Sequence, residues 1–241
     1  MTALSAEFSS MGMVLADQPL AGTLELRFSP LGLTLQHHGH ENGEAIRVDF
    51  AHPTFLYRLA HGGGRKQPLA RAMGLKPGYS PTILDATAGL GRDGFILASL
   101  GCRVVLCERS PIIRALLADG LDRALADPRL MAHASRCTLH PGDSRELLAA
   151  LAAEERPEVV YLDPMFPHRA KSALIKKEMR LVRAVVGDDV DTSDLLGVAL
   201  AHAGKRVVCK RPSQAPPLAG PAPAFAITTP KHRFDVYLRR G

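Results

Sequence analysis

The fold is decided by residues 82–94, TILDATAGLGRDG, which run from an apolar strand through a glycine turn into a helix. Gly89, Gly91 and Gly94 match the pattern G-x-G-x-x-G, and Glu108 ends the next apolar run about twenty residues later. Glycines at such a turn let a ligand approach the backbone and reach the amides of the helix N-terminus. An acid ending the second strand suits the ribose of a nucleotide. The segment predicts a nucleotide-type cofactor site on a Rossmann-like sheet; the alternative is a tight turn without a ligand.

Downstream of residue 80, predicted strands alternate with predicted helices. The strands are TILDAT (82–87), CRVVLCE (102–108), CTLHPGD (137–143), EVVYLDP (158–164) and KRVVCKR (205–211), and RFDVYLRR (233–240) returns as an antiparallel edge strand. The first predicted helix begins near Gly91, and the later ones cover residues 111–125, 144–155, 171–186 and 193–203. This succession predicts an α/β fold in which helices cover both faces of a mainly parallel sheet.

The chain upstream of residue 80 has a different pattern. Residues 1–60 contain the short alternating runs LELRFSP, LGLTLQ and AIRVDF, which predict a small β-rich N-terminal domain. Residues 61–80 include three successive glycines and several basic residues, and they predict a connector. We therefore expect the cofactor-binding domain to span residues 81–241.

Length and composition indicate one globular domain with a small appendage. The chain has 241 residues, of which 46% are hydrophobic and 22% charged, values typical of folded proteins rather than disordered ones. It shows no membrane-length apolar stretch and no charged leader before an apolar run, so we expect a cytoplasmic protein. Its four cysteines form no C-x-x-C pair and the cluster of His37, His38 and His40 resembles a solvated turn, so we expect no metal.

Charge points to a polyanionic partner. The formal net charge is +6, and the whole basic surplus lies from Asp163 onward. Such an asymmetry favours nucleic-acid binding. The alternative is that an Ala- and Arg-rich composition reflects only a GC-rich genome.

Two further acids lie at strand ends. Asp85 directly precedes the glycine turn, where it suits the ammonium and sulfonium of S-adenosylmethionine and would repel the pyrophosphate of a dinucleotide. Gly142 and Asp143 follow the third strand, where the carboxylate suits an adenine amino group, although the same pair is also a good helix entry. Together these positions favour S-adenosylmethionine over nicotinamide.

The most specific motif is Asp163-Pro164-Met165-Phe166-Pro167, at the end of the fourth strand. It is a variant of the Asp/Asn-Pro-Pro-aromatic loop of amino methyltransferases. An exocyclic base amine is a poor nucleophile, because its lone pair is delocalised into the ring. A carboxylate and a backbone carbonyl that accept its N–H bonds orient the lone pair, while the aromatic side chain stacks on the base. The motif predicts Asp163, Pro164 and Phe166 as catalytic residues; the alternative is a common turn with Phe166 in the core.

Across residues 61–237 the sequence resembles the RsmJ-like 16S ribosomal RNA (guanine-N2) methyltransferase family. The resemblance rests on HGGGR, LDATAGLGRDGF, GCRVVLCER, YLDPMFPHRAKSALIKKEM, KRVVCKRP and HRFDVY. It implies a seven-stranded Rossmann-like methyltransferase sheet, S-adenosyl-L-methionine as cofactor, and N2 of one guanine in 16S ribosomal RNA or the small subunit as acceptor. By matching motifs it also implies a set of cofactor contacts: Arg92, Asp93, Glu108, Arg109, Gly142, Asp143 and Asp163. Met165 replaces the second proline of the general loop, and residues 1–60 match weakly.

Basic residues after the catalytic loop predict an RNA-binding surface. Lys176, Arg180 and Arg183 form a stripe on the predicted helix 171–186, beside a stripe of apolar residues. Lys210 and Arg211 end a parallel strand and are expected at the same edge of the sheet. We predict that these five residues bind RNA phosphates; the alternative is an ordinary solvated basic face.

Two other functions remain compatible with parts of the sequence. A nicotinamide-dependent oxidoreductase accounts for the glycine turn and Glu108 but not for the loop at 163–167. A catalytically inactive RNA-binding module accounts for the charge but not for the cofactor turn.

Overall fold

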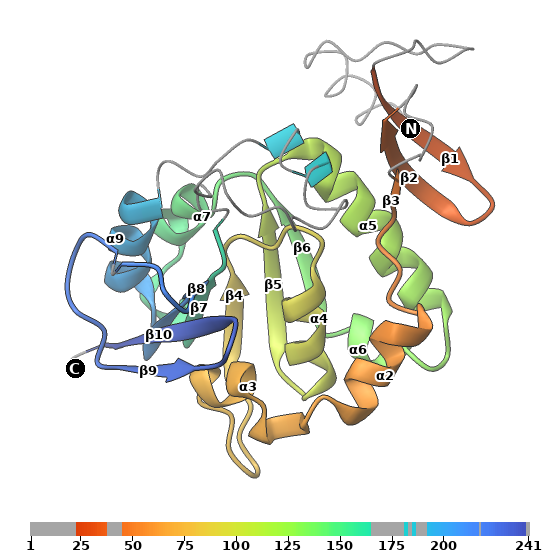
Figure 1. The fold of residues 1–241 in the computed structure, drawn as a ribbon. Helices are drawn as coiled ribbons and strands as arrows, with labels where there is room; N and C mark the ends of the chain where they lie inside the picture. The colour runs from red at the N-terminus through yellow and green to blue at the C-terminus, as the bar shows by residue number, and fades with distance from the viewer. Residues whose placement is uncertain are drawn as a thin grey trace.

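The computed structural model describes residues 23–37, 45–164, 181–182, 185–186, 192–216 and 218–239. In these ranges the chain forms a seven-stranded sheet with helices on both faces and a separate three-stranded sheet (Figure 1). The same ranges contain no helix that is both long enough and apolar enough to cross a bilayer.

The large sheet has the strand order β6-β5-β4-β7-β8-β10-β9. Its strands are β4 (Thr82–Asp85), β5 (Arg103–Glu108), β6 (Cys137–Pro141), β7 (Val159–Leu162), β8 (Arg206–Pro212), β9 (Phe225–Thr228) and β10 (His232–Leu238). The first five strands pair in parallel in the order β6-β5-β4-β7-β8, whereas β10 is antiparallel to its neighbours. The predicted seven-stranded sheet is confirmed. Its order reverses between β4 and β7, the place where open α/β sheets bind ligands.

The C-terminal strand lies at a different position from the predicted one. Its antiparallel direction is confirmed, but β10 lies between β8 and β9, so the edge strand on this side is β9. The sequence signal for β9 is weak because the strand has only four residues, three of them exposed, within a proline-rich segment. Without a buried face, it lacks the alternation that reveals a strand.

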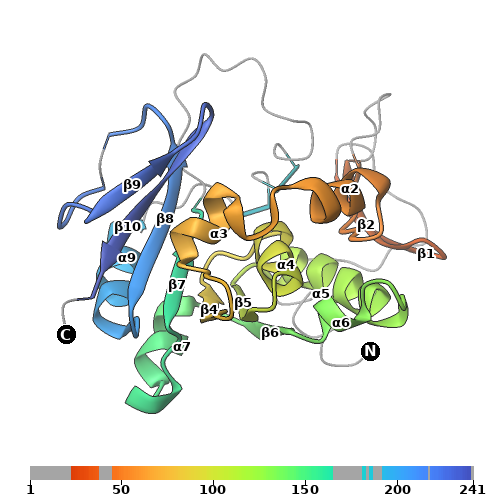
Figure 2. The same cartoon turned by 90° about the horizontal axis from the view of Figure 1, so that it is seen from below.

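Side chains alternate between the two faces of the sheet and build two apolar clusters. Ile83 belongs to the cluster under α4 (Arg92–Ser99) and α5 (Pro111–Ala126), whereas Leu84 belongs to the cluster under α7 (Ser144–Ala150) and α9 (Thr192–His202). Figures 1 and 2 show these helix pairs on opposite faces. The first face also carries the short helix α6 (Met131–Ala134). Near-continuous apolar strands are thus explained by burial on both faces.

Helix boundaries agree with the sequence prediction at most positions. α5 begins with Ser110 as N-cap and Pro111 at its first position, a favourable start for a helix. The predicted helix 144–155 is shorter than expected, because α7 ends at Ala150 and a 3₁₀ turn, η2 (Ala153–Glu155), follows. The predicted helix 171–186 lies outside the described residues except at 181–182 and 185–186.

The N-terminal part contains the predicted strands, and it also contains a helix at Pro53–His61 that was not predicted. β1 (Leu24–Ser29), β2 (Gly32–His37) and β3 (Ala45–Ile46) form an antiparallel sheet, followed by α2 (Pro53–His61), η1 (Gly64–Lys66) and α3 (Pro68–Met73). Leu35 and Ile46 share one apolar cluster with Leu117 of α5. The small sheet therefore packs on the helix layer of the large sheet. The division of the chain at residues 60 and 80 stays a prediction.

Candidate functional site

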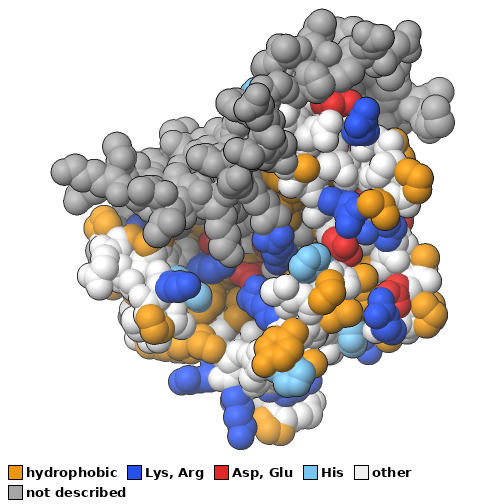
Figure 3. Space-filling model, turned by 45° about the vertical axis from the view of Figure 1, so that its right-hand side comes forward, with side chains coloured by type: hydrophobic (Ala, Val, Ile, Leu, Met, Phe, Trp, Pro, Cys, Tyr) orange, Lys and Arg blue, Asp and Glu red, His pale blue; other side chains and the backbone are white. Residues whose placement is uncertain are grey.

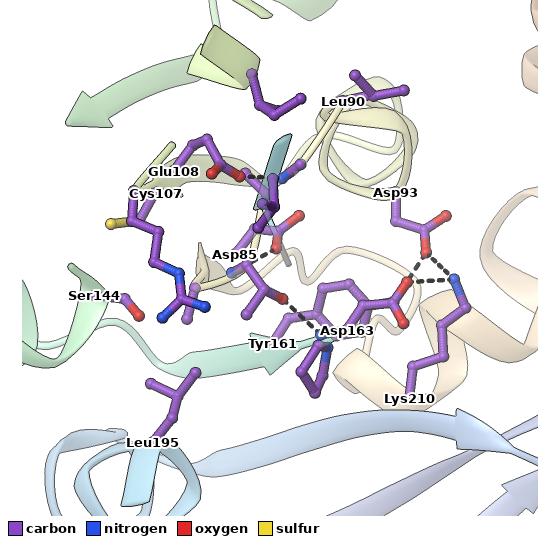
Figure 4. A pocket seen from close by; sticks show the side chains of 18 of the residues that line it. Asp85, Leu90, Asp93, Cys107, Glu108, Ser144, Tyr161, Asp163, Leu195 and Lys210 are labelled. Atoms are coloured by element: carbon purple, nitrogen blue, oxygen red, sulfur yellow. Dashed lines mark hydrogen bonds and ion pairs between the residues drawn. The ribbon is translucent and has the colours of Figure 1, made fainter. Parts of the chain in front are cut away.

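A pocket of about 340 Å³ lies at the carboxyl ends of the central parallel strands. It is lined by the turn after β4, the end of β5, the entry to α7, the end of β7 and one residue of β8. Figure 4 shows the side chains that meet there. Almost all predicted cofactor residues line the pocket: Asp85, Gly89, Arg92, Asp93, Glu108, Arg109, Gly142, Asp143 and Asp163.

The glycine turn adopts the conformation that its sequence predicts. Gly89 and Gly91 have φ angles of +53° and +72°, a region that favours glycine. A Cβ on Gly91 would also come within 2.5 Å of the Leu117 side chain. Gly91 itself is the N-cap of α4 and does not line the pocket, so its role is to let the turn enter the helix.

Glu108 connects two turns beside the pocket. Its Oε2 accepts a hydrogen bond of 2.8 Å from the Gly89 backbone N–H, and its Oε1 accepts one of 2.7 Å from Ser110. The residue is only 7% exposed. The carboxylate is therefore held in a fixed orientation at the end of β5.

Asp85 is a buried carboxyl group with few partners. It is 2% exposed, and among the described residues it accepts one hydrogen bond, a 3.4 Å contact from the Thr87 backbone N–H. Burial raises the pKa of Asp85 well above its usual range, and the nearby carboxylates of Asp93 and Asp163 raise it further. A cationic ligand in this pocket would supply the partner that the group lacks.

Two carboxylates converge on one ammonium, and a phenol contacts one of the carboxylates. Lys210 Nζ lies 2.8 Å from Asp93 Oδ2 and 2.7 Å from Asp163 Oδ2 (Figure 4). Tyr161 donates its hydroxyl proton to Asp93 Oδ2 at 2.8 Å. From the outside, Arg58 of α2 contacts Asp93 Oδ1 at 3.1 Å. This group of Lys210, Asp93, Asp163, Tyr161 and Arg58 is called the Lys210 network below.

The network changes the ionisation of its members. Burial opposes ionisation of Asp93, yet Lys210 and Arg58 lower the pKa of this carboxyl below its usual value. Burial and the charge of Asp93 raise the pKa of Asp163, while Lys210 acts in the opposite direction. The two carboxylates more than offset the burial of Lys210 and raise its pKa. Lys210 therefore stays charged and favours the ionised form of Asp163.

A second contact fixes Asp163 from the first turn. Its backbone N–H donates a hydrogen bond of 2.7 Å to Thr87 Oγ1, which joins the end of β7 to the turn after β4. Pro164 is buried and lines the pocket. Phe166, together with Met165 and Pro167, lies outside the described residues.

Comparisons with known proteins agree with this geometry. Residues 13–239 match the family described as "Putative SAM-dependent methyltransferase". A protein of Pseudomonas aeruginosa named ribosomal RNA small subunit methyltransferase J is 48% identical over 99% of this chain and 94% of its own length. A protein of the same name from Thioalkalivibrio sulfidiphilus is 51% identical over 91% of this chain and 88% of its own length.

This chain belongs to the ribosomal RNA small subunit methyltransferase J family. The crystal structure of a SAM-dependent methyltransferase from Neisseria gonorrhoeae is similar over 100% of this chain and 93% of that one, with a TM-score of 0.76 and 37% identity. The methyltransferase J family membership confirms the predicted resemblance, and it assigns S-adenosylmethionine rather than nicotinamide as the cofactor. The chain is an S-adenosylmethionine-dependent methyltransferase.

Gly142 and Asp143 combine the two roles that the sequence left open. Gly142 has a φ of +104°, and no atom lies within 4 Å of where its Cβ would be. Asp143 caps α7 by accepting a 2.8 Å hydrogen bond from the Arg145 N–H, and it forms an ion pair of 2.6 Å with the Arg145 guanidinium. Hydrogen bonds from Arg145 lower the pKa of Asp143. Both residues also line the pocket of this methyltransferase.

The predicted RNA-binding residues have different locations from one another. Lys176, Arg180 and Arg183 lie outside the described residues. Lys210 faces the pocket, but Arg211 is 5% exposed and does not line it. The expectation that both face one edge is wrong, because successive residues of a strand point to opposite sides.

Three members of the site were not predicted. Thr87 and Tyr161 lie within the quoted motifs, and Tyr161 shares a strand face with Asp163 because the two are two residues apart. Arg58 comes from α2 and carries no local signal in the sequence. The described residues contain no group of three or more His, Cys, Asp or Glu side chains that could hold a metal ion.

Proposed function

We propose that this chain transfers a methyl group from S-adenosylmethionine to the exocyclic N2 of a guanine in 16S ribosomal RNA, in the cytoplasm. The ribosomal RNA substrate is supported by the names of relatives that are 48–51% identical over at least 91% of this chain. The observation that carries the chemistry is the Asp163 carboxylate, which lines the pocket at the end of β7.

The pocket residues suit the chemical groups of the cofactor. Gly89 and Gly91 open the turn, Asp85 offers a carboxyl group to the ammonium, and Glu108 offers one to the ribose. Gly142 and Asp143 suit the adenine. The remaining proposed contacts are Arg92, Asp93 and Arg109. When bound, the cofactor supplies an activated methyl group on a sulfonium.

Asp163, Pro164 and Phe166 are proposed to position the acceptor base. Asp163 accepts one N–H bond of the amine, the Pro164 carbonyl accepts the second, and Phe166 stacks on the ring. The base must leave its stack to reach this pocket. Because Lys210 favours the ionised carboxylate, Asp163 can accept the hydrogen bond before methyl transfer.

Lys210 is proposed as a positioning residue rather than an RNA-phosphate contact. Its Nζ bridges Asp163 at the end of β7 and Asp93 at the start of α4. Neutralising two neighbouring carboxylates removes their mutual repulsion and holds both in place. Arg211, being buried, is not retained as a phosphate contact; Lys176, Arg180 and Arg183 stay predicted phosphate contacts.

The test is methyl transfer from labelled S-adenosylmethionine into unmethylated 16S ribosomal RNA and into assembled small subunits. We expect label in one guanosine, identified as N2-methylguanosine by mass spectrometry of the digested RNA. RNA carrying inosine at the mapped position is the matched control, since inosine differs from guanosine only by lacking the 2-amino group. Undiminished labelling of the inosine RNA, or label in another base, contradicts the proposed acceptor.

A further inference from the structure

The aromatic residues of α2 face two different environments. Phe55 is buried, and its ring centroid lies 5.5 Å from Phe50 and 5.9 Å from Phe95 of α4. Tyr57 is 67% exposed on another side of the same helix. Packing of Phe55 fixes the rotation of the helix, so the exposure of Tyr57 is set by the core rather than by a loose segment.

Tyr57 and His61 form a preorganised stack on the surface. Their ring centroids are 4.3 Å apart with an interplanar angle of 21°. His61 Nδ1 lies 3.2 Å from the Tyr57 carbonyl oxygen, which holds the imidazole ring against the phenol. Most of the tyrosine stays accessible to solvent, so a further planar group can join the stack.

The helix that carries the stack also contributes a residue to the methyltransferase pocket. Arg58, the residue after Tyr57, lines the pocket and forms the ion pair with Asp93 in the Lys210 network. α2 therefore contributes a basic side chain to the wall of the pocket. A nucleotide adjacent to an acceptor base in that pocket would lie near the helix, because successive nucleotides of one strand are a few ångströms apart.

The stretch of sequence that includes the stack is basic and contains no acidic residue. Between Asp49 and Asp85 the sequence contains Arg58, Arg65, Lys66, Arg71 and Lys76 and no Asp or Glu. Of these, Arg58, Lys66, Arg71 and Lys76 are exposed, whereas Arg65 donates hydrogen bonds to backbone carbonyls. Figure 3 shows Lys and Arg side chains in the middle of one face, beside His and hydrophobic side chains and with Asp or Glu side chains among them. Such a surface complements the phosphates of RNA.

We propose that the Tyr57–His61 stack is a binding site for an unpaired RNA base next to the acceptor guanine. Extrusion of the acceptor base leaves its neighbour without a stacking partner, and single-stranded RNA is commonly held by stacking on aromatic side chains. Exposed cations on the same stretch hold the flanking phosphates. The inference rests on the proposed RNA substrate and adds to it a subsite outside the pocket.

The test measures RNA binding without catalysis. Unmethylated 16S ribosomal RNA is titrated with wild type, Tyr57→Ala, Tyr57→Phe and Phe225→Ala, the last removing an aromatic residue that is 43% exposed on the remote strand β9. We expect Tyr57→Ala to weaken binding about fivefold to a hundredfold. Tyr57→Phe and Phe225→Ala should bind RNA as wild type does, and all variants should bind S-adenosylmethionine with unchanged affinity.

A fluorescence readout reports the stack directly. The chain has no tryptophan, so Tyr57→Trp introduces a single reporter at this position. Its emission should be quenched on addition of a single-stranded oligoribonucleotide, and a duplex of the same sequence should quench it far less.

Three outcomes are distinguishable. Equal RNA affinity of Tyr57→Ala and wild type, or equal loss in Phe225→Ala, overturns the stacking site while leaving the proposed function intact. Absence of quenching in Tyr57→Trp on RNA that the protein binds also overturns it. Failure of the wild type to methylate or bind ribosomal RNA instead removes the proposed function, together with the inference that rests on it.

Discussion

The two sides of the pocket hold their carboxylates in different ways. Glu108, at the end of β5, accepts hydrogen bonds from the backbone N–H groups of Gly89 and Ser110 in neighbouring turns. Asp163, at the end of β7, is paired with the side chain of Lys210 from β8. A backbone N–H donor survives every single substitution except one by proline, whereas any substitution of Lys210 removes its ammonium group. We therefore expect the cofactor side of the pocket to be robust and the acceptor side to depend on one lysine.

The largest effect is expected from removing the carboxylate on the acceptor side. Asp163→Ala should reduce methyl transfer about a hundredfold or more at saturating cofactor, because misplacing a reacting group costs on the order of 10² in rate. The fold should survive, since Asp163 is 39% exposed. Turnover, thermal melting and cofactor affinity are measured together, with Asp163→Asn as a variant of the same shape. Retention of more than a tenth of wild-type turnover by Asp163→Ala removes Asp163 from the mechanism.

Loss of Lys210 should give the next largest effect and a change in pH dependence. Lys210→Met removes the positive charge that favours the ionised form of Asp163, so we expect turnover to fall about tenfold to a hundredfold at neutral pH. Burial and Asp93 raise the pKa of Asp163, and Lys210 opposes them. Without Lys210 that pKa rises, so activity should be lost at a higher pH as the solution is acidified.

The pH profile of turnover separates this role from a general loss of structure. Lys210 also acts to lower the pKa values of Asp85, Asp93 and His232, so its loss shifts the ionisation of the whole network and not of Asp163 alone. Lys210→Arg, which keeps the charge, should recover part of the activity. Lys205→Met is the matched control, since Lys205 pairs with Glu158 just before β8 begins. If turnover falls at the same pH on acidification in Lys210→Met and in wild type, the positioning role of Lys210 is contradicted.

On the cofactor side, Glu108→Ala should mainly weaken binding of S-adenosylmethionine. Loss of a charge-assisted hydrogen bond costs about 1.5–3 kcal/mol, which corresponds to a tenfold to hundredfold rise in Kd. Glu108→Gln should lose less, because an amide oxygen can still accept a bond from Gly89 or Ser110. Isothermal titration calorimetry gives the affinities, and an unchanged Kd in Glu108→Ala places the ribose elsewhere.

The smallest effect is expected at the entry to α7. Arg145→Ala removes an ion pair with Asp143 in which the side chains are 33% and 23% exposed. Pairs this accessible contribute at most about 1 kcal/mol, so the melting temperature and cofactor affinity should change little. Asp143→Ala should do more, because it also removes the cap of α7. Equal effects of the two substitutions would show that the cap and the pocket contact are unimportant.

Local patterns were sufficient to predict most of the large sheet. The strands β4 to β8 alternate with helices and are apolar on both faces, and the glycine turn has the positive φ angles that its residues favour. The motif at 163–167 likewise predicted the position of the pocket, because a carboxylate at the end of a parallel strand lies beside the ends of the neighbouring strands. α2 and β9 were missed, since a short helix after a β-rich segment and an exposed four-residue strand carry weak periodicity.

Most of the sheet, the cofactor turn and the family of the chain can be recognised in the sequence, because each is encoded in contiguous residues. Which charges meet depends on how the strands and helices are arranged in space. Lys210 is 47 residues from Asp163 and 117 residues from Asp93, and Arg58 comes from the N-terminal helix. The sequence alone presented Lys210 and Arg211 as equivalent phosphate contacts, whereas the pleat of β8 turns the first into the pocket and buries the second. Local patterns report secondary structure, but the sign and distance of a neighbouring charge depend on which strands lie side by side.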